Sequence, residues 1–60
     1  MWKTVIQIAE DENQRNDLEF NQLLDIEEGH MIYYKDKPYD VMNIIFFLDT
    51  KVKLIVIKEQ

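Results

Sequence analysis

The hydrophobic positions of this chain are concentrated between residues 39 and 57. Two runs, 39–48 and 51–58, are rich in the β-branched and aromatic residues that favour strands. Asp49 and Thr50 lie between the runs and form a short polar turn. We therefore predict a β-hairpin over these residues, and we expect the rest of the chain to pack on it.

The predicted strand 39–48 is apolar on both faces, which is unusual for a strand of a single sheet. One face carries Tyr39, Val41, Ile45 and Phe47, and the other carries Met42, Ile44, Phe46 and Leu48. Two interpretations remain open. The strand bends sharply, as the long strands of small barrels do, and both halves serve one core. Alternatively, one face stays exposed for a partner or a second copy of the chain.

Two further segments have the period-two alternation of half-buried strands. In residues 2–9 the side chains of Trp2, Thr4, Ile6 and Ile8 fall on one face. Residues 31–35 form the second segment, and a turn over 35–38 follows, where Pro38 marks a strand edge because proline cannot donate to a ladder. Gly29 is the one glycine, and it stands at a turn where a positive φ is expected.

Residues 17–28 allow two interpretations. Phe20, Leu23 and Leu24 have helical spacing, and Asp17 could cap the helix. The segment also alternates like two extended pieces that meet at residues 21–22. In either case Leu18, Phe20, Leu24 and Ile26 are expected to reach the core. Residues 10–16 hold no apolar side chain and are predicted to be a surface loop.

These elements predict a single small domain over residues 1–60, of mainly β or α+β class. We expect a four- to five-stranded antiparallel sheet or barrel, with 17–28 as a short helix or a long loop. The segments Asp17-Leu18-Glu19-Phe20 and Ile26-Glu27-Glu28-Gly29-His30-Met31-Ile32 resemble the region around the diverging turn of SH3-like barrels. The resemblance implies the fold only. The aromatic residues that form the polyproline groove of signalling SH3 domains have no counterparts here, so that activity is not carried over.

Composition restricts the chemistry. The chain has 60 residues and no cysteine, so it lacks disulfides and thiolate metal sites. Its longest uninterrupted apolar run, 44–48, is five residues, against the roughly 20 that a spanning helix needs. The first residues lack the apolar centre of a signal peptide. We therefore expect a cytoplasmic protein that does not contact a membrane.

The net charge of −5 is unevenly distributed. Residues 1–30 hold eight acids and two bases (−6), and residues 31–60 hold four acids and five bases (+1). Binding to a phosphate backbone needs clustered Lys and Arg, so nucleic acid is not an expected partner. The acidic half is a solvated surface, a face for a basic partner, or an imitation of nucleic acid.

Catalysis is not expected. The chain has one histidine and no serine or cysteine, which rules out Ser–His–Asp and Cys–His arrangements. With a single glycine it has no phosphate-binding loop, and a concave pocket is hard to enclose in a chain this short. The acids near His30 match neither a zinc nor a calcium pattern. We expect no catalytic residues, no cofactor and no metal.

The function that remains is non-enzymatic protein binding. We predict a small regulator or inhibitor, of the type carried by phages and mobile elements, that occludes a surface of its partner. Glu10, Asp11 and Glu12 would steer it to a basic patch. Tyrosines are favoured at interfaces, and the predicted contact residues are Tyr33, Tyr34 and Tyr39. The alternatives are an obligate homo-oligomer and an acidic mimic of nucleic acid.

Overall fold

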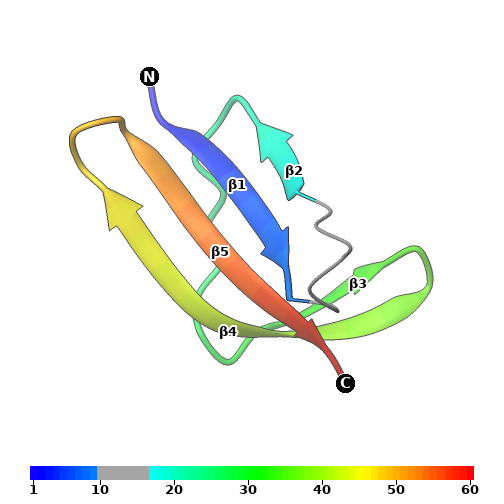
Figure 1. The fold of residues 1–60 in the computed structure, drawn as a ribbon. Helices are drawn as coiled ribbons and strands as arrows, with labels where there is room; N and C mark the ends of the chain where they lie inside the picture. Colours follow the sequence, from blue (N-terminus) through cyan, green and yellow to red (C-terminus); the bar gives the residue numbers. More distant parts are fainter. Residues whose placement is uncertain (10–16) are drawn as a thin grey trace.

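In the part of the chain that the structure describes, five strands form one curled sheet, like half of a barrel (Figure 1). A computed structural model describes residues 1–9 and 17–60. The order across the sheet is β2-β1-β5-β4-β3. The bounds of the strands are β1 Lys3–Ile8, β2 Asp17–Phe20, β3 Met31–Tyr34, β4 Lys37–Phe47 and β5 Val52–Glu59. The predicted mainly β class is confirmed, and no helix occurs in the described part of the chain.

The sheet differs from the predicted antiparallel arrangement in one pairing. β1 and β5 run parallel, with Thr4 beside Lys53 and Ile6 beside Ile55. The other three pairs are antiparallel. As a result β5, which carries the end of the most apolar stretch, lies at the centre of the sheet and not at an edge. In this central position both edges of β5 are paired with neighbouring strands, β1 and β4, which suits a strand rich in Ile and Val.

Residues 17–28 adopt the extended alternative. They begin as β2, where Leu18 pairs with Ile6, and bend at residues 21 and 22. Residues 21–30, the crossing segment, then pass behind β1, β5 and β4 as the sheet is seen in Figure 1 and lead into β3. Leu24 and Ile26 of this segment are half-buried against the core, whereas Leu23, Asp25 and Glu27 are exposed. This period of two in burial belongs to an extended chain and excludes a helix.

Three tight connections depend on left-handed backbone. Gly29 has φ 86°, and the N–H of His30 donates to the Glu27 carbonyl at 3.2 Å, the pattern of a type II turn. The predicted positive φ at Gly29 is confirmed. The β3–β4 hairpin turns on Lys35 and Asp36, both with positive φ, as a two-residue type I′ loop requires. Lys51, before β5, has φ 55°.

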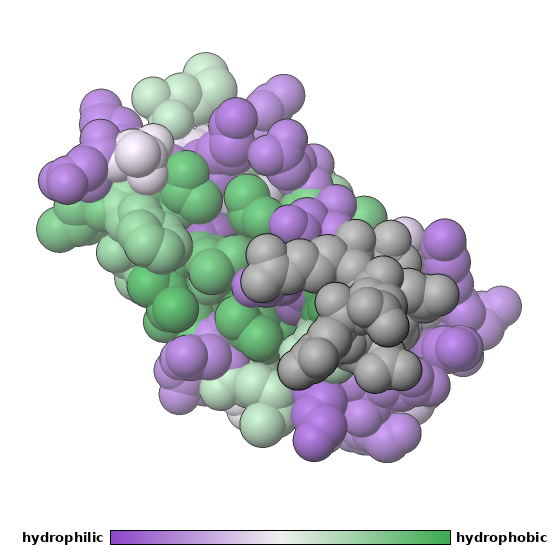
Figure 2. Space-filling model, in the orientation of Figure 1, coloured by the Kyte–Doolittle hydropathy of each residue, from purple (hydrophilic) through white to green (hydrophobic). Residues whose placement is uncertain are grey.

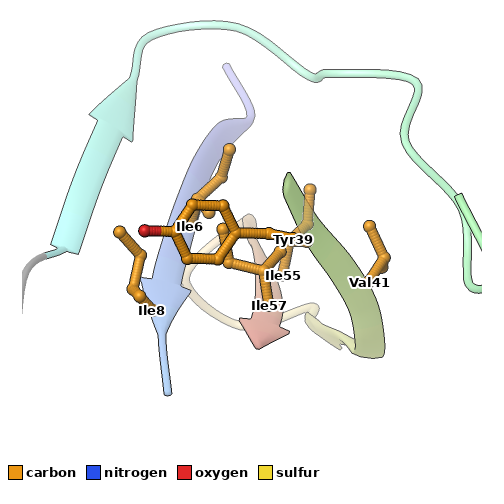
Figure 3. Close-up of a cluster of buried hydrophobic side chains, with 6 residues drawn as sticks. All are labelled: Ile6, Ile8, Tyr39, Val41, Ile55 and Ile57. Atoms are coloured by element: carbon orange, nitrogen blue, oxygen red, sulfur yellow. The ribbon is translucent and has the colours of Figure 1, made fainter. Parts of the chain in front are cut away.

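The core lies between the crossing segment and the face of β1, β4 and β5 that this segment covers. Six apolar side chains, drawn in Figure 3, are buried there: Ile6, Ile8, Tyr39, Val41, Ile55 and Ile57. A β-bulge between Val41 and Asn43 bends β4. Before the bulge β4 pairs with both β3 and β5, and beyond residue 41 it pairs only with β5 among the described residues.

Candidate functional site

Two buried polar side chains fix the crossing segment to the sheet. Thr4 is fully buried, its Oγ1 donates to the Gln22 carbonyl at 2.8 Å, and the same Oγ1 accepts from the Leu24 N–H at 3.0 Å. Lys53, beside Thr4 on β5, is 5% exposed, and its Nζ donates to the Leu24 carbonyl at 2.7 Å. These bonds satisfy backbone groups of a segment that has no strand ladder of its own.

A groove opens between the crossing segment and the second half of β4. It has a volume of about 500 Å³ and is lined by residues 23–28, by Ile44 and Phe46 of β4, and by Lys53. The Lys53 Nζ lies 5.5 Å from the centre of the Phe46 ring, and Trp2 packs edge-on against the same ring at 6.0 Å. The ammonium group of Lys53 is therefore held by the Leu24 carbonyl and an aromatic face.

The rim of the groove is acidic. Asp25, Glu27 and Glu28 are exposed, and none of them has a cationic partner within 4.0 Å among the described residues. Residues 17–30 hold five carboxylates and no Lys or Arg. The groove therefore combines apolar flanks with a negative rim, and its one lysine is already bonded.

The other face of the sheet is also apolar. Figure 2, in the orientation of Figure 1, shows hydrophobic side chains gathered on the side turned away from the crossing segment. The strand registers place six side chains there, which we call the apolar face: Val5, Ile45, Phe47, Val52, Leu54 and Val56. Ile45 and Phe47 are 38% and 46% exposed, and the four others are half-buried by their neighbours in the sheet. No layer of the described residues covers this face.

The structure separates the tyrosines that were predicted to bind a partner. Tyr33 is 68% exposed, whereas Tyr34 is half-buried, with its ring 6.5 Å from that of Tyr39 and the Lys35 Nζ 5.3 Å from its centre. Tyr39 is 3% exposed and belongs to the core, so its ring is not available to a partner. The strand alternation of β4 places Tyr39 inward together with Val41.

The predicted acidic contacts Glu10, Asp11 and Glu12 lie outside the described residues. Among the described residues, no group of three His, Cys, Asp or Glu side chains is placed to hold a metal ion. The Nδ1 of His30 accepts a hydrogen bond from the Glu27 N–H at 3.3 Å within the turn. The described chain contains no helix with the length and apolarity needed to cross a membrane.

Sequence reasoning missed the groove and its lysine. A lysine between apolar strand positions is normally solvated, and at a sheet edge it only hinders strand-to-strand association, so residue type alone offered no reason to place Lys53 in a binding site. The alternation of residues in β5 does indicate that Lys53 is buried, since Lys53 shares a face with Ile55 and Ile57. The groove could not be predicted from the sequence, because one of its walls is the crossing segment, for which the sequence allowed both a helix and an extended conformation.

No protein-family model, curated protein or solved structure matches this chain.

Proposed function

We propose that this chain is a non-enzymatic protein-binding module, built on a small barrel of the SH3-like kind, that acts by occluding a surface of its partner. The observation that carries the proposal is the apolar face, where Ile45 and Phe47 are exposed on the curled sheet and nothing in the described chain covers them. Contiguous apolar side chains of this kind mark interaction sites, because burying them removes ordered water from apolar surface.

The surroundings of this face fit a protein partner with positive charge. Asp17 and Glu19 of β2 extend the same face beyond Gln7 and Val5, as the β1–β2 register shows. Carboxylates at the margin of an apolar patch form a polar rim, which steers a partner of opposite charge and contributes little to affinity. A cytoplasmic regulator or inhibitor from a phage or mobile element remains the expected biological setting.

The test is capture of a partner by the tagged protein, with variants that change only this face. In the Ile45→Thr/Phe47→Thr variant two exposed apolar side chains become polar and keep or gain β-branching, so the strand is retained. Met31→Thr is the control, because Met31 is 52% exposed on β3, outside the face. Thermal melts establish that both variants fold. We expect a stoichiometric partner with the parent and with Met31→Thr, and at least a tenfold loss with the double variant. Equal capture by all three proteins would refute the role of the apolar face.

A second copy of the chain is the other candidate occupant. Two identical sheet faces can pack at about 10 Å around a two-fold axis, which buries both apolar faces at once. In that case the melting temperature of the parent rises with protein concentration, and that of Ile45→Thr/Phe47→Thr does not. Sedimentation of the parent as a monomer at all concentrations would exclude this occupant.

A further inference from the structure

We infer that the acid-rimmed groove takes an extended segment of a partner protein, which adds to the open edge of β4 and presents Lys or Arg to the rim. The inference rests on the proposed function only in taking the ligand to be a protein segment, since the groove and the apolar face lie on opposite sides of the sheet. Three features of the molecule support it: a free strand edge, a hollow beside that edge and a rim of negative charge.

The free edge is the second half of β4. β3 pairs with β4 only from Lys37 to Asp40, and the Val41 N–H and carbonyl are bonded to the His30 carbonyl and the Gly29 N–H. From Asn43 to Phe47, β4 pairs with β5 on one side and with no described strand on the other, as Figure 1 shows. An unpaired edge presents a row of backbone donors and acceptors that a further strand can satisfy.

The hollow lies on the same side as this edge. A strand added beside residues 43–47 directs alternate side chains to the face that carries Ile44 and Phe46, the two β4 residues that line the groove. These side chains would fill the space of about 500 Å³ between β4 and the crossing segment. The added strand would thereby occupy the gap at which the half-barrel is open.

The charge of the rim selects the chemistry of those side chains. Asp25, Glu27 and Glu28 lie across the groove from β4, and no described cation is within 4.0 Å of them. A Lys or Arg in a groove-facing position lays its aliphatic stem along Ile44 and Phe46 and places its charged end at these carboxylates. An acidic segment is disfavoured, because it would bring like charges together in a partly desolvated space. The one cation that lines the groove, Lys53, is 5% exposed and is already bonded to the Leu24 carbonyl.

The probe is a labelled peptide, acetyl-Thr-Lys-Thr-Leu-Thr-Lys-Thr-amide, with Lys, Leu and Lys on one side of the strand. Its binding is measured by fluorescence anisotropy at low ionic strength, and a peptide with Glu in place of both Lys is the charge control. We expect binding of the Lys peptide and at least tenfold weaker binding of the Glu peptide. The test variant is Asp25→Asn/Glu27→Gln/Glu28→Gln. The matched variant Asp36→Asn/Asp40→Asn/Asp49→Asn removes three exposed charges outside the groove and the apolar face, and Asp40→Asn keeps the Oδ1 that accepts from Gln60. An exposed ion pair changes affinity about two- to threefold, so we expect about a tenfold loss for the groove variant and less than twofold for the matched one.

Strand addition has its own signature. N-methylation of alternate peptide residues gives two complementary peptides, of which one blocks the ladder with β4 and the other does not. We expect one of them to lose binding, and we expect backbone amides within residues 43–47 to gain protection from hydrogen exchange. Equal binding of the two methylated peptides, protection elsewhere, or equal affinity of both triple variants would overturn the inference. The Asp25→Asn/Glu27→Gln/Glu28→Gln variant leaves Ile45 and Phe47 unchanged, and the peptide assay does not depend on capture of a partner, so the proposed function and this inference fail separately.

Discussion

The Thr4 hydroxyl is expected to stabilise the whole fold, because it fixes the crossing segment that covers the core. Thr4→Val removes the hydroxyl and keeps the shape of the side chain. The change breaks two hydrogen bonds, to the Gln22 carbonyl at 2.8 Å and from the Leu24 N–H at 3.0 Å. Each bond contributes about 1 kcal/mol net, so the free energy of unfolding should fall by about 2 kcal/mol. For a domain of this size about 1 kcal/mol corresponds to about 4–8 °C, and the melting temperature should fall by about 8–16 °C.

The chain offers a matched control for this substitution. Thr50, the other threonine, is exposed in the turn before β5, and Thr50→Val should change stability by less than about 0.5 kcal/mol. Urea unfolding followed by tryptophan fluorescence gives both values, and hydrogen exchange at Leu24 reports the local release of the segment. If Thr4→Val unfolded at the same urea concentration as the parent, the crossing segment would not be held by this hydroxyl. Combined with Lys53→Met, which removes the bond to the Leu24 carbonyl, Thr4→Val should give a non-additive loss, because both side chains hold the same residue.

Four further substitutions separate backbone from packing effects, and the stability of each variant is measured by thermal or urea unfolding. Gly29→Ala should lower the free energy of unfolding by about 1–2 kcal/mol, because a residue with a Cβ is strained at a φ of 86°. An added Cβ meets no atom within 4 Å, so no clash adds to this loss. An unchanged stability would contradict the left-handed turn. Lys51→Gly should stabilise by about 0.5 kcal/mol, because glycine removes the strain of φ 55° at some cost in unfolded-state entropy; a loss of stability would show that the lysine side chain contributes packing. Ile55→Val should lower the free energy of unfolding by about 1 kcal/mol, because Ile55 has no exposed surface. Ile45→Val should lower it much less, because Ile45 is 38% exposed on the opposite face. Equal losses would mean that both faces are buried.

Local pattern was sufficient to predict β1, β3, β4 and β5, whereas residues 17–28, which include β2, were left with two interpretations. The turn predicted over 35–38 is shorter, because Lys37 and Pro38 belong to β4. The alternation of residues 2–9 placed Thr4, Ile6 and Ile8 on one face, and all three are buried in the structure. The polar turn at Asp49 and Thr50 and the left-handed Gly29 were likewise predicted from residue types that favour such conformations. These features depend on contacts within a few residues, which is the range over which a single sequence is informative.

Long-range pairing was not accessible in the same way. The sequence does not state which strands are neighbours, and the parallel pairing of β1 with β5 joins residues about 50 positions apart. That pairing decides the role of Lys53. At an edge it would be a solvated lysine, but beside Thr4 at the centre of the sheet its ammonium group bonds to the Leu24 carbonyl. The candidate groove therefore follows from topology more than from residue type.

The doubly apolar strand 39–48 bends, as the first interpretation expected, and it also leaves one face of its second half exposed, whereas a partner or second copy on that face stays a proposal. The bulge between Val41 and Asn43 bends the strand, so that Tyr39 and Val41 enter the core. Beyond the bulge, Ile44 faces the core side and Ile45 and Phe47 remain exposed on the other. A single strand thus contributes to the core, to the groove and to the apolar face.

Among the described residues, the apolar face lacks a covering layer because only one segment is long enough to form such a layer. A sheet has two faces, and each needs a covering layer if both are apolar. Among the described residues, only the crossing segment is long enough to cover a face, because the loops after β3 and β4 are tight hairpin turns. It covers the side that carries Ile55, and Thr4 and Lys53 fix it there. Leu54 and its neighbours on the opposite side would be replaced by polar residues if solubility alone decided them. Their presence together on the apolar face is the observation that supports the proposed partner.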